Sequence, residues 1–163
     1  MSTKRKKSWQ EKLADDKGLP EVSTVTADMN QKWGQGRMVI PAPREVDALM
    51  RQVRKGRVTT INELRAALAR RHHADFACPI TTGIFSWIAA HAAEERRAEK
   101  PGAGVTPWWR TLKTGGRLNP KYPGGLAEQS RRLEAEGHQL IVGRGGSSIR
   151  VAGYEQKLAK FTR

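Results

Sequence analysis

Residues 106–138 read TPWWRTLKTGGRLNPKYPGGLAEQSRRLEAEGH, and this short basic stretch joins two adjacent tryptophans to glycine-rich turns and a helical pattern. Gly115-Gly116 and Pro123-Gly124-Gly125 are strong turn signals, because glycine adopts backbone conformations that other residues avoid. The turns stand between the tryptophans and the helical pattern. The stretch therefore predicts that Trp108 and Trp109 lie on an ordered loop rather than in a helix.

The rest of the chain predicts a mainly α fold with a small C-terminal β-hairpin. Apolar residues recur at helical spacing in several segments, and two of these segments open with capping signals, Ser8 with Glu11 and Thr60 with Glu63. The expected helices span about residues 8–16, 43–56, 60–71, 80–100, 126–136 and 154–161. Residues 138–142 and 148–152 flank a glycine-rich connection and predict the hairpin. Two helices joined by a short turn and followed by a hairpin are typical of a winged helix-turn-helix.

The chain divides into a basic N-terminal extension, residues 1–40, and a domain, residues 41–163, which starts at a Pro-Ala-Pro sequence. We expect the extension to lie across the domain with Trp9 or Trp33 as its anchor. The run at residues 4–7 is either a solvated tail or a contact for DNA phosphate.

The charge calls for an acidic partner. A formal net charge of +14 and a pI near 10.6 favour nucleic acid, because bound phosphates release counterions, although charge that only keeps a protein soluble is the alternative. The lone Cys78 allows no intramolecular disulfide and indicates a reducing compartment. No apolar run approaches the roughly 20 residues of a membrane span. We expect a cytoplasmic, nucleoid-associated protein, a monomer without membrane contact, cofactor or metal site.

The order P-x-x-R, a glycine-containing loop, Y-x-G-G-L and a helix ending L-x-x-E-G resembles the DNA-binding domain of the 6-O-alkylguanine DNA alkyltransferases (methylated-DNA-protein-cysteine methyltransferases). The matching residues are Pro107, Arg110, Tyr122, Gly124, Gly125, Leu126, Leu133, Glu136 and Gly137. The family's transferases carry Pro-Cys-His-Arg at residues 107–110. With tryptophan at the nucleophile position, the chain resembles the family's non-catalytic branch, the alkyltransferase-like proteins.

The resemblance implies a protein that recognises 6-O-alkylguanine-type damage without transferring the alkyl group, and that marks the damage for downstream repair proteins. An indole has no thiolate, so Trp108 cannot displace an alkyl group. Trp109 replaces the family's histidine, and Glu136, which matches the orienting carboxylate, is left with nothing to orient. We therefore expect no enzyme activity.

The resemblance also implies a lesion pocket. Trp108 would stack on an extruded base and Tyr122 would form a second wall, whereas Arg110 would steady the loop rather than contact phosphate. The alternative is that the tryptophans fill the core. The pocket residues are Trp108, Trp109, Arg110, Tyr122, Gly124 and Glu136.

Double-stranded DNA, alkylated or not, is the expected partner of the helix-turn-helix and of the hairpin. The expected contacts are small hydroxyls, a glycine that lets backbone approach, and cations: Thr60, Thr81, Thr82, Gly83, Ser86, Lys113, Lys121 and Arg144. The alternative is that the threonines only cap the helix. Ile61 stands where the family has a tyrosine, and residues 80–82 lack its intercalating arginine, which leaves base flipping open.

Two other functions stay open at this point. One is a general or regulatory winged-helix DNA-binding protein without lesion preference, which would bind with a steep salt dependence. The other is alkyl transfer to Cys78, at a helix start where the dipole lowers a thiol pKa. A lone cysteine beside apolar residues is more often a buried side chain.

Overall fold

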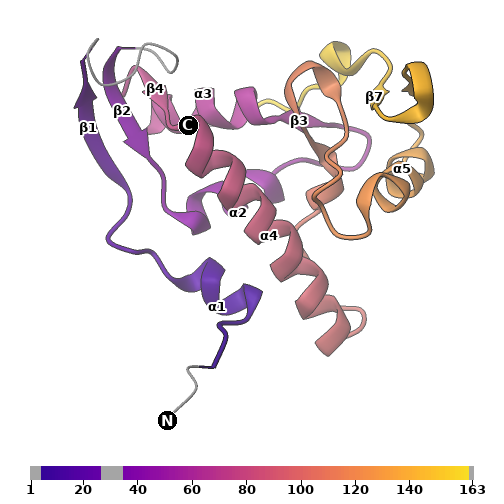
Figure 1. The fold of residues 1–163 in the computed structure, drawn as a ribbon, viewed down its shortest axis with the longest axis horizontal. Coiled ribbons are helices and arrows are strands. Elements are labelled where there is room, and N and C mark those ends of the chain that lie inside the picture. The colour runs from indigo at the N-terminus through magenta and orange to yellow at the C-terminus, as the bar shows by residue number, and fades with distance from the viewer. Residues whose placement is uncertain (1–4, 27–34, 162–163) are drawn as a thin grey trace.

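The computed structural model describes residues 5–26 and 35–161. Helices dominate this part of the chain, and the strands are short (Figure 1). The elements are α1 (Trp9–Ala14), β1 (Glu21–Val25), β2 (Gly36–Ile40), α2 (Pro43–Arg51), β3 (Thr59–Thr60), α3 (Ile61–Arg71), β4 (Phe76–Ala77), α4 (Pro79–Glu99), the 3-10 turn η1 (Trp108–Arg110), β5 (Thr111–Leu112), η2 (Thr114–Gly116), α5 (Gly125–Ala135), β6 (Leu140–Val142), η3 (Arg144–Gly146), β7 (Ile149–Val151) and η4 (Tyr154–Lys157).

The long helix α4 crosses the centre of the molecule, and α1, α2 and α3 pack against it (Figure 1). The apolar positions of these helices recur every three or four residues, so that each helix turns one stripe inward. Their fully buried side chains form the main core together with one tryptophan of the twin pair: Val46, Met50, Leu64, Leu68, Ala89, Ala90 and Trp108.

Local capping explains where two of the predicted helices begin. The Ser8 hydroxyl accepts the Glu11 N–H at 3.1 Å, and the Thr60 hydroxyl accepts the Glu63 N–H at 3.3 Å. Each bond satisfies a backbone donor that has no partner within the helix. The helices expected over residues 8–16, 43–56, 60–71, 80–100 and 126–136 are confirmed as α1, α2, α3, α4 and α5, each within a few residues of the expected ends.

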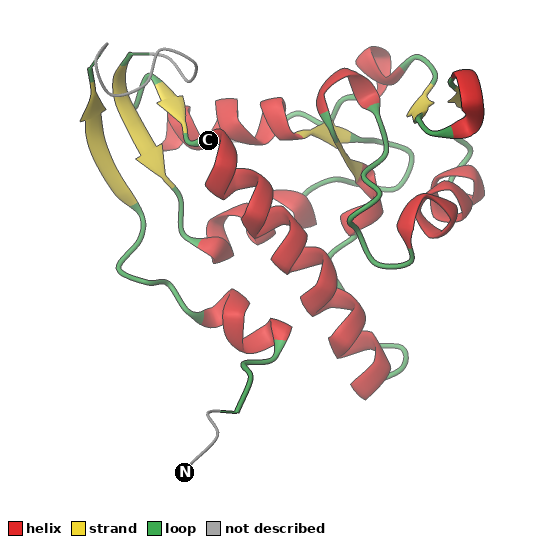
Figure 2. Cartoon of the chain, in the orientation of Figure 1, coloured by secondary structure: helices red, strands yellow, loops and turns green. Residues whose placement is uncertain are grey.

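A small sheet beside the start of α4 was not expected. β1 pairs antiparallel with β2, and β2 pairs parallel with β4. Figure 2 shows this sheet on one side of α4 and the β6–β7 hairpin on the other. The prediction of β-structure only at the C-terminus was therefore wrong. No strand was predicted over residues 21–40, and the two residues of β4 are too few to give a periodic signal in the sequence.

The C-terminal part packs around a second apolar cluster, formed by Val58, Leu112, Leu118, Leu133 and Val151. β3 pairs parallel with β5, and the predicted hairpin is confirmed as β6 paired antiparallel with β7. The final helix is shorter than expected and is the 3-10 turn η4, which ends at Lys157.

The N-terminal extension contacts the domain through α1. Trp9 stacks on His91 with ring centroids 4.5 Å apart and meets Trp87 edge-on at 4.8 Å. The Glu95 carboxylate accepts the backbone N–H groups of Trp9 and Gln10 at 3.2 and 3.1 Å, which caps α1 from outside. Trp9 is thus an anchor, as predicted, whereas Trp33 and residues 1–4 lie outside the described residues. The division at residue 40 stays a prediction, and β2, which ends at that residue, shares a sheet with β4.

Candidate nucleic-acid interface

The sequence predicts an ordered loop for the twin tryptophans, and they begin a 3-10 turn, η1, of three residues. Trp108 is 0% exposed, its indole N–H donates to the Glu94 carboxylate at 3.0 Å, and its ring meets Tyr122 edge-on at 5.6 Å between centroids. The expectation that Trp108 presents its face to an extruded base is therefore wrong for this structure. Burial with a satisfied N–H is the behaviour of a core tryptophan.

Arg132 on α5 completes the surroundings of the two tryptophans. Its guanidinium lies 5.2 Å from the Trp108 ring centroid and 4.7 Å from that of Trp109, within reach of cation–π attraction. The same group donates to Glu94 at 2.7 Å and to Glu128 at 2.8 Å. Arg132 is buried, so these two carboxylates supply the counter-charge that a buried guanidinium requires. The cluster joins α4, η1 and α5.

Arg110 steadies the loop, as expected, and Glu136 is its partner. Two guanidinium nitrogens of Arg110 donate to the two Glu136 oxygens at 2.9 and 2.6 Å, and a third donates to the Val53 carbonyl at 2.7 Å. Burial raises the pKa of Glu136, but the hydrogen bonds and charge of Arg110 outweigh this effect and leave the pKa below its usual value. The expectation that Glu136 has nothing to orient is wrong, because it orients Arg110.

Tyr122 and Gly124 shape the turn before α5. Tyr122 is 2% exposed, its hydroxyl donates to the Ser86 hydroxyl at 3.4 Å, and burial raises its pKa to about 12. Gly124 has φ 79° as the residue before α5, and a Cβ there would lie 2.5 Å from the Glu128 side chain, so glycine is required. Trp108 and Tyr122 therefore form closed packing, whereas Trp109 is only partly buried and Gly124 is exposed.

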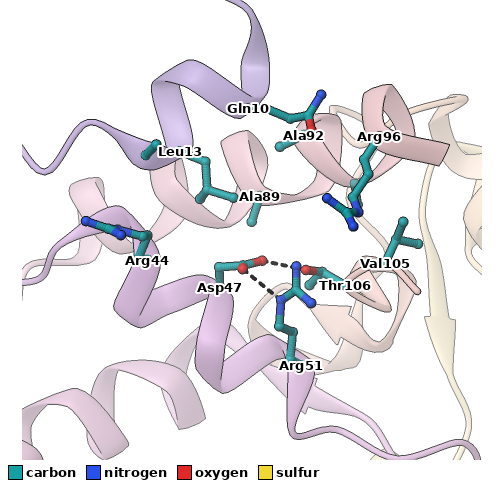
Figure 3. Close-up of a pocket in the computed structure, with 12 residues that line it drawn as sticks. Gln10, Leu13, Arg44, Asp47, Arg51, Ala89, Ala92, Arg96, Val105 and Thr106 are labelled. Carbon is teal, nitrogen blue, oxygen red and sulfur yellow. Dashed lines mark hydrogen bonds and ion pairs between the residues drawn. The ribbon is translucent and has the colours of Figure 1, made fainter. Parts of the chain in front are cut away.

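The two cavities described in the structure lie elsewhere. An open pocket of about 200 Å³ is lined by α1, α2, α4 and the segment before η1, and Asp47 in its wall accepts from Thr106 at 2.5 Å and from Arg51 at 2.9 Å (Figure 3). A larger cavity of about 910 Å³ lies between α3, the end of α2 and Phe161. Neither is lined by Trp108, Trp109 or Tyr122.

Three of the hydroxyls predicted to contact phosphate are buried and already bonded, which corrects that prediction. Thr60 caps α3, Thr82 donates to the Cys78 carbonyl at 2.7 Å, and Ser86 donates to the Gly83 carbonyl at 2.8 Å. The Thr81 hydroxyl is also buried, and it has no hydrogen-bond partner among the described residues. Gly83 has room for a side chain, because a Cβ built there meets no atom within 4 Å outside its chain neighbours and the nearby backbone of α4.

The remaining predicted contacts, Lys113, Lys121 and Arg144, are exposed, and they lie among further exposed cations. We define the basic strip as Lys113, Arg117, Lys121, Arg144 and Arg150. Within the described residues, none of the five has a carboxylate oxygen within 4.0 Å. Arg117 was not among the predicted contacts. The sequence does contain a signal for it, because no Asp or Glu occurs between Glu99 and Glu128 to pair with the cations of that segment.

Backbone contacts connect the segments that carry the basic strip. An isolated antiparallel bridge pairs Arg117 with Arg150, and the Leu118 N–H donates to the Ile149 carbonyl at 2.8 Å. At its other end, the Lys121 carbonyl accepts the Trp87 indole N–H at 3.1 Å and lies 3.3 Å from the His91 ring nitrogen. The strip therefore runs from the hairpin to the middle of α4.

Cys78 lies at the start of α4, in an apolar cluster with Val25 and Met38, and it is buried. A thiol so placed does not reach a base in a DNA duplex without movement of the surrounding strands. Within residues 5–26 and 35–161, no three His, Cys, Asp or Glu side chains are grouped so as to hold a metal ion. The same part of the chain contains no helix of the length and apolarity that a membrane crossing needs.

No family model matches the chain, and no curated protein matches it. A crystal structure of S. pombe Atl1 in complex with damaged DNA containing O6-carboxymethylguanine is similar to the chain at 19% sequence identity and a TM-score of 0.49. The similarity covers 72% of this chain and 94% of that chain. A likeness at this level assigns neither a family nor a function.

Proposed function

We propose that the protein binds double-stranded DNA as a winged helix-turn-helix, with α3 and α4 as the helix pair and β6–β7 as the wing. The observation that carries the proposal is the bridge between Arg117 and Arg150. Like charges directly opposite each other across a strand pair destabilise a fold. A surface that keeps such a pair, with Lys113, Lys121 and Arg144 and with no carboxylate of the described residues in an ion pair with them, is suited to a polyanion.

Ion pairing is distributed unevenly over the described residues, which favours the side of the molecule with the basic strip as the DNA-binding side. Several cations near α1 and α2 are paired, as in Arg5–Glu11, Lys7–Asp15 and Arg44–Asp16. The two charges of each pair neutralise each other, so a paired cation attracts phosphate only weakly. The basic strip offers charges that phosphate can neutralise without first breaking an ion pair among the described residues.

The finer proposal is recognition of 6-O-alkylguanine-type damage without alkyl transfer. Trp108 supplies no thiolate, and the thiol of Cys78 is buried in an apolar cluster. An alkylated guanine pairs poorly, so that extruding it costs less than extruding a paired base. Binding would then mark the damage for downstream repair proteins in the cytoplasm, with the protein acting as a monomer.

A second candidate is general binding to duplex DNA without lesion preference. The full burial of Trp108 and Tyr122 favours it, because the two rings form closed packing rather than a pocket for a base. Lesion recognition requires this packing to open.

A titration of matched duplexes separates these functions. One duplex carries a single 6-O-methylguanine and the other carries guanine, both at one fixed physiological salt concentration, and the intact mass of the protein is recorded afterwards. Tighter binding to the alkylated duplex with unchanged mass supports a non-catalytic sensor. Equal binding supports the general function, a mass gain that is lost in Cys78→Ser supports transfer, and binding to neither duplex overturns the proposal.

A further inference from the structure

The open pocket between α1, α2 and α4 has an apolar floor. Three alanines of α4 line it, and because each side chain is only a methyl group, the neighbouring helices leave a space in front of them (Figure 3). The apolar residues that line the pocket are Leu13, Ala14, Ala89, Ala92, Ala93 and Val105. Its volume of about 200 Å³ is below the roughly 300–1,000 Å³ of sites for drug-sized ligands. The pocket is therefore of a size for a compact organic molecule.

The walls of the pocket carry three arginines and one carboxylate. The carboxylate is Asp47, which is buried and accepts from Arg51 through one oxygen and from Thr106 through the other. The ion pair with Asp47 fixes the Arg51 guanidinium at the edge of the pocket. Arg44 pairs with Asp16, which does not line the pocket.

Arg96 is the third arginine. It enters the pocket from α4, and Figure 3 shows its side chain and that of Arg51 reaching towards the same space. Among the described residues, no carboxylate oxygen lies within 4.0 Å of the Arg96 side-chain nitrogens. The nearby carboxylates of α4, Glu95 and Glu99, accept hydrogen bonds from Gln10 of α1. Two guanidinium groups, one of them fixed by an ion pair, thus face the apolar floor.

We propose that this pocket binds a small organic anion, a carboxylate on a compact aliphatic body, with the carboxylate between Arg51 and Arg96 and the body against the alanines of α4. A guanidinium donates two parallel N–H groups to a carboxylate, and such charge-assisted bonds are stronger than neutral ones. A phosphate fits less well, because the apolar floor would strip water from its further oxygens without replacing the hydrogen bonds. The pocket shares no residue with the basic strip, so this inference is independent of the DNA binding proposed above.

Such a ligand would also hold α1 in place. Gln10, Leu13 and Ala14 of α1 form one wall of the pocket, so the complete site exists only while α1 is docked on α4. A ligand that binds only the docked form stabilises that form by mass action. Occupancy of the pocket should therefore slow amide hydrogen exchange in α1.

The test is a titration of the isotope-labelled whole chain with isocaproate, followed through its backbone amide resonances by NMR at constant pH and ionic strength. The matched ligands are isocaproamide, which has the same body without the charge, and inorganic phosphate. We expect saturable shifts around the pocket, with a dissociation constant on the order of 1 mM for isocaproate. Binding of both matched ligands should be at least about tenfold weaker.

Two variants and an exchange measurement locate the ligand. Arg96→Gln should weaken isocaproate binding roughly tenfold, because it removes one charged donor. Arg97→Gln removes the next arginine of α4, which does not line the pocket, and should change the affinity by less than about twofold. Both side chains are exposed, so neither substitution alters the core. Amide exchange in α1 should slow at saturating isocaproate and stay unchanged in the same concentration of isocaproamide.

Each part of the proposal can fail separately. Without saturable shifts for isocaproate, the pocket does not bind such an anion. Equal binding of isocaproamide means that the arginines do not recognise the charge, and tighter binding of phosphate reassigns the pocket to phosphoryl groups. Equal weakening in Arg96→Gln and Arg97→Gln means that net charge alone attracts the ligand. Saturable binding with unchanged exchange in α1 places the ligand away from the α1 wall and overturns the assignment of this pocket.

Discussion

Trp108 is the residue whose role differs most from its sequence prediction. Its ring is buried in the main core beside α4, and its N–H donates to the Glu94 carboxylate. Trp108→Ala should lower the free energy of unfolding by about 3–5 kcal/mol through lost packing. Trp108→Phe should cost less, about 1–3 kcal/mol, because it keeps most of the apolar volume and loses the hydrogen bond.

Urea denaturation at neutral pH measures both changes. Val142→Ala serves as the control, since this exposed side chain lies outside the core and its loss should change stability by at most about 0.5 kcal/mol. A Trp108→Ala protein as stable as this control would show that the tryptophan is not part of the core in solution.

The ion pair of Arg110 and Glu136 makes a second prediction. Glu136→Gln keeps the shape of the side chain but leaves a largely buried guanidinium without its counter-charge, at a cost of about 3–5 kcal/mol. Arg5→Gln breaks an exposed pair and should change stability by less than about 1 kcal/mol.

The effect of Glu136 depends on pH in a defined direction. Its folded-state pKa is depressed, so its contribution is present above the unfolded-state pKa and is lost as pH falls through the folded-state value. The difference in unfolding free energy between wild type and Glu136→Gln should therefore shrink towards acid pH. A difference that is constant from neutral to acid pH would contradict a charge-dependent role.

The Tyr122 hydroxyl is expected to lose its proton at a higher pH than an exposed tyrosine. Burial raises its pKa to about 12 from an ordinary value of 10.0, so its contribution to stability is fully present below about pH 10 and is lost as pH rises towards 12. The near-ultraviolet absorbance of wild type minus that of Tyr122→Phe isolates this side chain during an alkaline titration. A midpoint near 10 would show that the Tyr122 ring is open to solvent.

At the scale of elements, α1 is held by a cap that belongs to α4. Glu95→Ala removes the acceptor for the N–H groups of Trp9 and Gln10, a loss of about 1 kcal/mol. Amide hydrogen exchange in α1 should become roughly five- to tenfold faster, while exchange in α4 stays unchanged. Glu99→Ala is the control, because Glu99 accepts only from the Gln10 side chain among the described residues. Equal exchange in both variants would show that Glu95 does not hold the arm.

Helices with capping signals and the C-terminal hairpin were predicted from the sequence, whereas the sheet of β1, β2 and β4 was not. Thr60 and Glu63 predict the start of α3 from a pattern of four residues, and the glycines between β6 and β7 predict the hairpin. β4 consists of two residues and exists because β2, almost forty residues earlier, offers it backbone partners. Pairing over that separation leaves no trace in local periodicity.

The candidate site was predicted in part for the same reason. Matching residues in the sequence brought Trp108, Arg110, Tyr122 and Glu136 together, and they do lie close in space. Which way Trp108 turns depends on Glu94, a residue of α4 that no local pattern connects with it. Burial of a side chain is decided by such distant partners.

At the scale of the whole molecule, the basic strip predicts how DNA binding responds to salt. Each phosphate contact contributes about 0.9 to the slope of log affinity against log salt, so Arg117→Ala/Arg150→Ala should reduce the slope by about 1.8. Arg44→Ala/Arg71→Ala removes the same charge from two ion pairs elsewhere and serves as the control. Equal reductions in the two variants would show that net charge alone attracts the DNA.

Glu94 makes position 108 intolerant of a small side chain. The carboxylate serves the Trp108 indole and Arg132 at once, so a cysteine introduced at position 108 would enter a closed space shaped for an indole. The new thiol would lie in the core, beside a void and a carboxylate that had lost one donor. Presenting a nucleophile from this position would need several coordinated substitutions across α4, η1 and α5, because each of these elements supplies part of the packing around the ring.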